Sequence, residues 1–152
     1  MKKMILCLVV LLLAGVSHSF QDPDFFTGTG WSVNGTASVS YNGYCNITKQ
    51  IFNSATEVYQ QETAFTAGKN YQVQIVITSL GGTLDIGWQD AGSNWKSGSF
   101  QAVTNSTGTF TLTCSDSAYN YVVIDAVSSV CIAQIDSATT SQLSDVSDWE
   151  LY

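Results

Sequence analysis

The sequence has few charged residues and lacks arginine altogether. Only 11% of its 152 residues are charged, and it contains a single histidine and a single proline. Its charge is one-sided, because five lysines stand against twelve acidic residues and give a net charge of −7. A surface of this sign repels nucleic-acid phosphates and anionic lipid headgroups. We therefore expect no nucleic-acid partner and no membrane-surface role.

The first residues have the pattern of a secretory signal peptide. Two lysines precede an apolar run over residues 4–16, and Ser17 and Ser19 supply small residues for cleavage before Phe20. The run is shorter than the roughly 20 apolar residues of a membrane-spanning helix, although a retained anchor is the alternative. We expect residues 1–19 to be removed, leaving a secreted or cell-surface protein with no membrane contact.

The absence of histidine and arginine from the rest of the chain limits the chemistry available to it. Beyond residue 19, three lysines remain against twelve acids, so the net charge is about −9. Ser-His-Asp and Cys-His catalysis, histidine-ligated zinc and arginine clamps on phosphate are excluded. Carboxylate catalysis of the glycosidase kind needs two facing acids, and nothing in the sequence marks two acids as facing. We expect a protein that is not an enzyme.

Strand periodicity runs through the body of the chain. Apolar and polar residues alternate over residues 71–77, 83–89 and 109–114, as in half-buried strands. Further β-rich runs cover residues 36–41, 44–52, 58–65, 119–127 and 130–135. Asn42-Gly43, between two of these runs, favours a type I′ hairpin turn. Short strands at this spacing predict an all-β sandwich or barrel.

The alternating pattern ends near residue 137. We therefore expect one β-domain over residues 20–137, followed by an acidic C-terminal tail over residues 138–152. The tail ends in Trp149, Leu151 and Tyr152. It is either a frayed terminus or a short adhesive segment through which the protein self-associates, since exposed aromatic residues often anchor interfaces.

Four short motifs follow one another along the body. They are Asp24-Phe25-Phe26-Thr27-Gly28-Thr29-Gly30-Trp31, the spaced set Gln61, Gly68, Tyr71 and Val73, the stretch Gly108-Thr109-Phe110-Thr111, and the stretch Ala133-Gln134-Ile135-Asp136. In this order they resemble motifs of family-4- and family-16-type carbohydrate-binding modules and the related galactose-binding-like jelly rolls. Similar modules occur on phage tails and other virion surfaces. The resemblance implies a jelly-roll β-sandwich of two antiparallel sheets that binds glycans or surface polysaccharides.

The same resemblance implies a structural calcium ion. Acids near the first and last strands often share one in this family, which points to Asp24 and Asp136. Calcium takes six to eight oxygen ligands, so backbone carbonyls would have to complete the site. The alternative is that both are plain surface acids.

Glycan sites in such sandwiches combine aromatic platforms with amide and carboxylate hydrogen-bonding groups. Trp31 and Trp88 are expected in the core, the first in the opening motif and the second in phase with buried residues. Trp95 lies in the polar stretch over residues 92–98, where no core is at hand, and is the predicted platform. The competing interpretation is that Trp95 packs against its own loop or a neighbouring subunit.

Three polar side chains complete the predicted site. Asp85 and Gln89 alternate with the apolar positions of their strand and so face away from the core. Gln61 occupies the glutamine position of the family motif. With Trp95, these residues form the predicted glycan-binding set.

Three cysteines remain after the leader, Cys45, Cys114 and Cys131. In a secreted protein this number suggests one disulfide and one unpaired thiol. Cys114–Cys131 closes the shortest loop and is the first candidate pair. Cys114 also alternates in phase with apolar residues, which suits a free thiol in the core.

These observations leave three classes of function. The first is a secreted, non-catalytic glycan-binding module, and the alternative is a structural or adhesive subunit of a virion, pilus or cell envelope. A small carboxylate-based glycosidase is the third.

Overall fold

The computed structural model describes Phe25 and residues 28–63 and 65–143, which form ten β-strands. In chain order these are β1 (Ser32–Asn34), β2 (Ser38–Tyr41), β3 (Cys45–Lys49), β4 (Thr56–Gln61), β5 (Asn70–Gly81), β6 (Thr83–Gln89), β7 (Trp95–Thr104), β8 (Gly108–Cys114), β9 (Tyr121–Ala126) and β10 (Cys131–Leu143). The described part contains no helix that could cross a membrane. The predicted signal peptide and most of the predicted tail lie outside the described residues.

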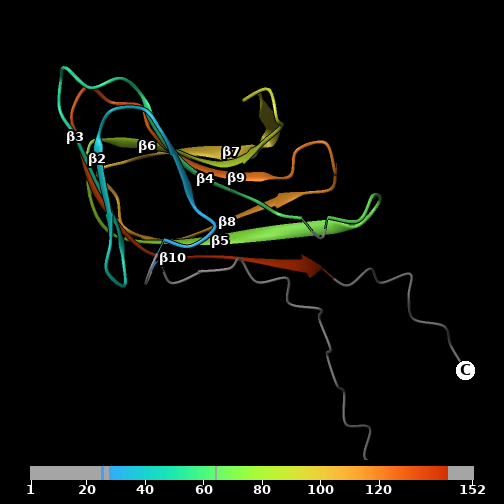
Figure 1. Cartoon of the computed structure of the whole chain (residues 1–152). Helices are drawn as coiled ribbons and strands as arrows, with labels where there is room; N and C mark the ends of the chain where they lie inside the picture. Colours follow the sequence, from blue (N-terminus) through green and yellow to red (C-terminus); the bar gives the residue numbers. More distant parts are fainter. Residues whose placement is uncertain (1–24, 26–27, 64, 144–152) are drawn as a thin grey trace, which may run out of the picture.

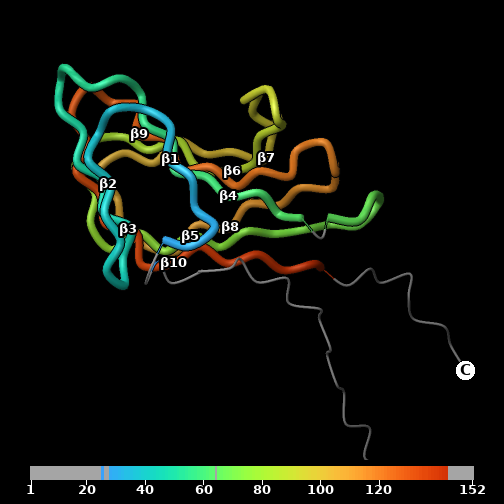
Figure 2. Tube along the Cα trace, viewed as in Figure 1, coloured from blue at the N-terminus to red at the C-terminus, as the bar shows by residue number. Residues whose placement is uncertain are grey.

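The strands form two five-stranded sheets that face each other as a sandwich (Figures 1 and 2). Sheet A has the order β1-β4-β9-β6-β7 and sheet B the order β2-β3-β10-β5-β8, with every neighbouring pair antiparallel. Strands that follow one another in sequence repeatedly change sheet, as in a jelly roll. The predicted all-β jelly-roll sandwich is confirmed.

The core lies between the two sheets and follows the alternation seen in the sequence. The side chains of Val73, Ile75, Leu84 and Ile86 have no exposed surface. Trp88 is also fully buried, and its indole N–H donates a hydrogen bond to the Leu112 carbonyl at 3.3 Å. These residues confirm the predicted inward faces of β5 and β6.

The opening tryptophan closes one side of this core. Trp31 is only 8% exposed, and its ring centroid lies 4.7 Å from that of the fully buried Phe25. The core position expected for Trp31 is therefore confirmed. Phe25 also stacks on the Tyr41 ring of β2 at 6.2 Å, so the segment before β1 is packed against sheet B.

Two boundaries in the structure differ from those expected. The expected domain end at residue 137 falls inside β10, which continues to Leu143 and pairs with β5 as far as Asn70. The polar composition of residues 138–143 suggested a tail, but Ala138 and Thr140 are buried on the inner face. The stretch that was expected to be a loop around Trp95 is in part the start of β7.

The predicted disulfide between Cys114 and Cys131 is wrong, because all three cysteines of the described part are free and buried. Cys114 pairs with Tyr71 at one end of β5, whereas Cys131 lies beside the residue paired with Gly81 at the other end. A strand of 12 residues spans roughly 40 Å, whereas bridged cysteines have Cα atoms within about 7 Å. The alternative of a free thiol in the core holds for Cys114.

Candidate functional site

The outer face of sheet A brings the four predicted glycan-binding residues together. Gln61 pairs with Tyr121, Tyr121 with Gln89, and Gln89 with Trp95. These four positions form one row across β4, β9, β6 and β7, and their side chains alternate with the buried core residues. Asp85 lies on the same face, two positions before Gly87 on β6. We call this surface the A face.

Two further rows complete the A face. The middle row comprises Ser32, Tyr59, Val123, Gly87 and Phe100, and the third comprises Asn34, Glu57, Asp125, Asp85 and Ala102. The first two rows carry aromatic rings, and the third is dominated by acids. Gly87 has no side chain at the centre of the face, and a Cβ there would collide with the Ser99 carbonyl oxygen. No side chain therefore projects from the A face at the position of Gly87.

A pocket of about 170 Å³ lies on this face beside the β6–β7 loop. Its lining combines two tyrosine rings with amide, hydroxyl and carboxylate groups, namely Asn34, Glu57, Tyr59, Gln89, Asp90, Ala91, Ser93, Tyr121 and Val123. Gln89 is the only predicted site residue in this lining. Trp95, Asp85 and Gln61 flank the pocket on the same face.

The tyrosines of the pocket were missed by sequence reasoning. The Tyr59 and Tyr121 rings lie 6.2 Å apart in an edge-to-face arrangement. Both rings are partly exposed. The signal that could have found them is the alternation itself, because each occupies an outward position next to a buried valine, Val58 and Val122 respectively.

The predicted platform Trp95 is partly exposed on β7 and has a ring neighbour. Its ring is stacked on that of Phe100 at 5.3 Å, and Phe100 is 42% exposed. Both rings belong to β7, so the alternative that Trp95 packs within its own segment holds. The role of Trp95 as a sugar platform stays a prediction. The two rings extend the aromatic surface of the A face towards the edge strand.

Hydrogen bonds within the β6–β7 loop hold one wall of the pocket. The Asp90 carboxylate accepts hydrogen bonds from the Gly92 amide at 2.8 Å, the Asn94 amide at 2.9 Å and the Asn94 side chain at 3.0 Å. The bonds from Asn94, above all, lower the pKa of Asp90. Asp90 therefore stays ionised and keeps a fixed negative charge beside the pocket.

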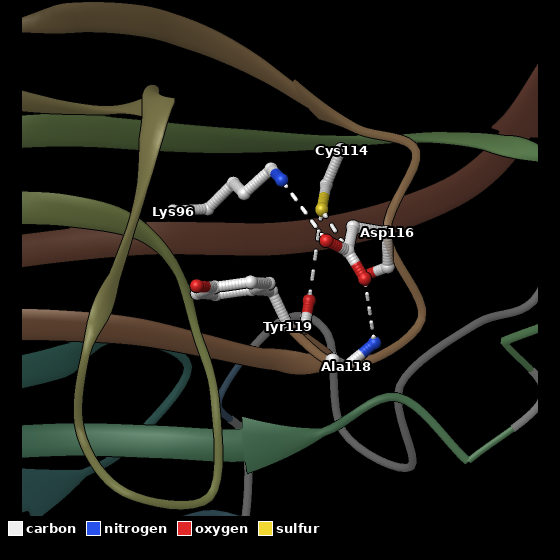
Figure 3. A network of polar contacts seen from close by, with 5 residues as sticks. All are labelled: Lys96, Cys114, Asp116, Ala118 and Tyr119. Atoms are coloured by element: carbon white, nitrogen blue, oxygen red, sulfur yellow. Dashed lines mark hydrogen bonds and ion pairs between the residues drawn. The ribbon is translucent and has the colours of Figure 1, made fainter.

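A second polar network ties the beginning of β7 to the β8–β9 loop (Figure 3). The Lys96 ammonium binds the Asp116 carboxylate at 3.0 Å and lies 4.9 Å from the centre of the Tyr119 ring. Asp116 also accepts a hydrogen bond from the Ala118 amide at 3.1 Å. The hydrogen bond to Asp116 raises the pKa of Lys96, and that from Lys96 lowers the pKa of Asp116. The network anchors the strand residue that follows Trp95.

The third row of the A face, which we call the acidic row, brings three carboxyl groups side by side on adjacent strands. Glu57 and Asp85 are the cross-strand neighbours of Asp125 on either side, and Asp125 is only 9% exposed. Burial, and then the charges of Glu57 and Asp85, raise the pKa of Asp125 to about 6, although Lys49 acts in the opposite direction. Burial also raises the pKa of Asp85. The Asp125 Oδ1 atom is buried and has no hydrogen-bond partner.

The predicted calcium site stays a prediction. Asp24 lies outside the described residues, and Asp136 is a half-buried residue at an irregularity of β10. The described ranges contain no group of three His, Cys, Asp or Glu side chains placed to hold a metal ion. Asp136 would have to be joined by backbone carbonyls and by the undescribed Asp24.

No protein-family model matches the sequence, and no curated protein is significantly similar to it. Solved structures do resemble the fold. A mutant of a family 29 carbohydrate-binding module matches with a TM-score of 0.52 and 13% identity over 80% of this chain and 87% of its own. The module titled BiXyn10A CBM1 matches with a TM-score of 0.54 and 13% identity over 78% and 94%.

An enzyme contains a similar fold as a part of its structure. The enzymatically active domain of tailspike protein 4 from bacteriophage CBA120 matches with a TM-score of 0.54 and 10% identity, over 84% of this chain. This chain covers only 22% of that domain, about a fifth of its length. At these identities the likeness concerns the fold alone, a β-sandwich that occurs both in carbohydrate-binding modules and within this enzyme domain.

Proposed function

We propose that this chain is a secreted, non-catalytic carbohydrate-binding module that binds extracellular glycans through the A face. The observation that carries the proposal is the pocket, where Tyr59, Tyr121 and Gln89 converge on one side of the sandwich. Aromatic rings cover the C–H faces of sugars, and amide and carboxylate groups bind their hydroxyls. The signal-peptide pattern predicted over residues 1–19 supports export of the chain.

A binding role fits these groups better than a catalytic one. General-acid catalysis requires a carboxyl group within hydrogen-bond reach of the leaving oxygen. Asp125 has the raised pKa of such a group, but its Oδ1 atom is buried and it does not line the pocket. Stacking and a few hydrogen bonds to sugar give weak binding, of the order of 0.1–1 mM.

The test is calorimetric titration of the mature protein with soluble oligosaccharides of neutral, amino and acidic sugars. We expect saturable binding to at least one class, and loss of it in Tyr59→Ala. The matched control is Thr111→Ala, an exposed hydroxyl on the outer face of sheet B. Failure of every class to bind at millimolar concentration would contradict the proposal, as would equal binding by Tyr59→Ala.

The second candidate is an adhesive or structural surface subunit of a virion, pilus or cell envelope. It is favoured by two large apolar side chains in the β3–β4 loop, Ile51 at 77% and Phe52 at 78% exposure. Exposed apolar groups of this size are typical of protein contacts. Self-association in sedimentation velocity, combined with no sugar binding, would favour this candidate.

A further inference from the structure

The pocket on the A face has the chemistry of a site for a positively charged group. Two acidic residues, Glu57 and Asp90, and two aromatic residues, Tyr59 and Tyr121, belong to its lining. Tyrosine faces attract cations by about 0.5–2 kcal/mol, and carboxylates bind ammonium groups through charge-assisted hydrogen bonds. No lysine lines the pocket.

The acidic row adds further negative charge beside the pocket. Glu57 belongs both to the pocket and to the row, where Asp125 and then Asp85 follow it on adjacent strands. Asp125 is more than nine-tenths buried, and its Oδ1 atom lacks a hydrogen-bond partner. A buried carboxylate oxygen without a donor is costly. A cation at the neighbouring Glu57 would reduce this cost.

The lysines of the described part offset the charge of the A face only in part, through the effect of Lys49 on Asp125, and none of them lines the pocket. The Lys49 ammonium is buried between the sheets and donates to the Ala126 carbonyl at 2.7 Å. Lys96 is bound to Asp116 in the network of Figure 3. Lys69 lies in the connection between β4 and β5. The pocket therefore faces a concentration of negative charge.

We infer that the pocket takes a sugar bearing a free ammonium group, in preference to a neutral sugar, and rejects sugars that carry carboxylates. This inference rests on the proposed glycan binding and names its ligand class. The ammonium would donate to the Glu57 carboxylate beside the faces of Tyr59 and Tyr121, while Gln89 binds a ring hydroxyl. The pocket volume of about 170 Å³ suits one sugar ring of a longer chain, since it is below the roughly 300–1,000 Å³ of sites for larger ligands.

The test uses two oligosaccharides that differ in the group at C2 of each sugar, a free ammonium in one and a neutral acetamide in the other. Hexamers of β-1,4-linked glucosamine and of N-acetylglucosamine are titrated calorimetrically at low and high salt, with a galacturonic acid hexamer as the anionic probe. We expect the glucosamine hexamer to bind about tenfold more tightly than its acetylated form at low salt, because charge-assisted bonds exceed neutral ones. The difference should shrink at high salt, and the galacturonic acid hexamer should not bind.

Variants separate the charge of the pocket from that of the whole protein. Glu57→Gln removes one pocket charge and retains a partner for the Asn34 side chain, which donates to Glu57 at 3.3 Å. We expect Glu57→Gln to remove most of the preference for the amino sugar and Asp85→Asn to reduce it. The control Gln74→Glu changes the net charge by one unit in the opposite direction, at an exposed position of sheet B. It should leave the preference unchanged, whereas an effect of overall charge would strengthen it.

The outcomes separate the inference from the proposed function. Equal or tighter binding of the acetylated hexamer would overturn the preference for an amino sugar and leave glycan binding intact. The same conclusion follows if Glu57→Gln and Asp85→Asn both keep the wild-type preference. No binding of any oligosaccharide in the neutral, amino and acidic panel would overturn both. A salt-sensitive preference that Glu57→Gln abolishes and Gln74→Glu preserves would support the inference.

Discussion

The outer faces of the two sheets are built by the same alternation but carry different chemistry. The A face holds tyrosine, tryptophan and phenylalanine rings beside a row of acids and a pocket. The outer face of sheet B carries hydroxyl and amide side chains along β5 and β8, with Gln72, Gln74, Thr109, Thr111 and Thr113 as examples. The fold needs only the inner residues to be apolar. The difference between the outer faces is therefore where function is to be sought.

The largest expected effect is on sugar binding. Tyr121 lies in the first row between Gln61 and Gln89 and also lines the pocket. Tyr121→Ala removes a ring from the pocket wall and the edge-to-face partner of Tyr59. Because sugar binding by the wild type is already weak, we expect removal of the Tyr121 ring to lower the affinity below the detection limit of calorimetry. Thr113→Ala, an exposed position on the outer face of sheet B, should bind like wild type, and a Tyr121→Ala protein that binds normally would show that the pocket is not the site.

Sequence and structure agree where periodicity decides the outcome. Alternation alone predicts that Leu84, Ile86 and Trp88 face inward, and all three are buried. It predicts that Asp85 and Gln89 face outward, where Asp85 is half-buried and Gln89 lines the pocket with only 4% of its surface exposed. Alternation follows from the geometry of a single strand, so it needs no knowledge of neighbouring strands. The same local rule predicted the all-β class.

Pairing between strands could not be predicted in this way. The row that joins Gln61, Tyr121, Gln89 and Trp95 depends on registers among strands distant in sequence. For the same reason, the short sequence separation of Cys114 and Cys131 said nothing about their positions on the sheet. Alternation marks Tyr59 of β4 and Tyr121 of β9 only as outward-facing. That they converge on one pocket depends on the register between the strands, so the sequence could not predict it.

The next largest effect concerns what the acidic row contributes to the free energy of unfolding of the protein. The pKa of Asp125 is about 6 in the folded protein, against an ordinary value of 3.8. Between these values the folded chain binds a proton that the unfolded chain releases, so this contribution to stability falls as the pH rises through this window. Asp125→Asn cannot ionise. We expect it to stabilise the protein by about 2–3 kcal/mol at pH 7, with little change at pH 4.

Chemical denaturation of wild type and Asp125→Asn at both pH values measures this difference. Asp90 and Asp116 have lowered pKa values and act in the opposite direction at lower pH, but they are common to both proteins and cancel. Lys49, whose charge opposes the effect at Asp125, is also unchanged. A difference in unfolding free energy that is the same at pH 4 and pH 7 would contradict the raised pKa.

A smaller effect is expected at the edge of the A face. Trp95 lies outside the lining of the pocket and stacks on Phe100, so it would contact only sugar rings that extend beyond the pocket. Trp95→Ala should weaken binding of a hexasaccharide about threefold and leave that of a disaccharide unchanged, because the shorter ligand stays within the pocket. Titration with both lengths measures this. An equal loss for both would place Trp95 in the pocket after all.

The smallest expected effect is that of a reducing agent, and it concerns the inner face of sheet B. Cys45, Cys114 and Cys131 all belong to this sheet and are buried without a disulfide. Burial raises the pKa of Cys45 to about 12 and also raises those of Cys114 and Cys131, so the reactive thiolate is scarce in all three. Reductant should therefore leave the melting temperature unchanged. A thiol reagent at neutral pH should modify the mature protein only after denaturation. A drop in melting temperature on reduction would instead reveal a bridge, which the register of β3, β8 and β10 does not allow in this fold.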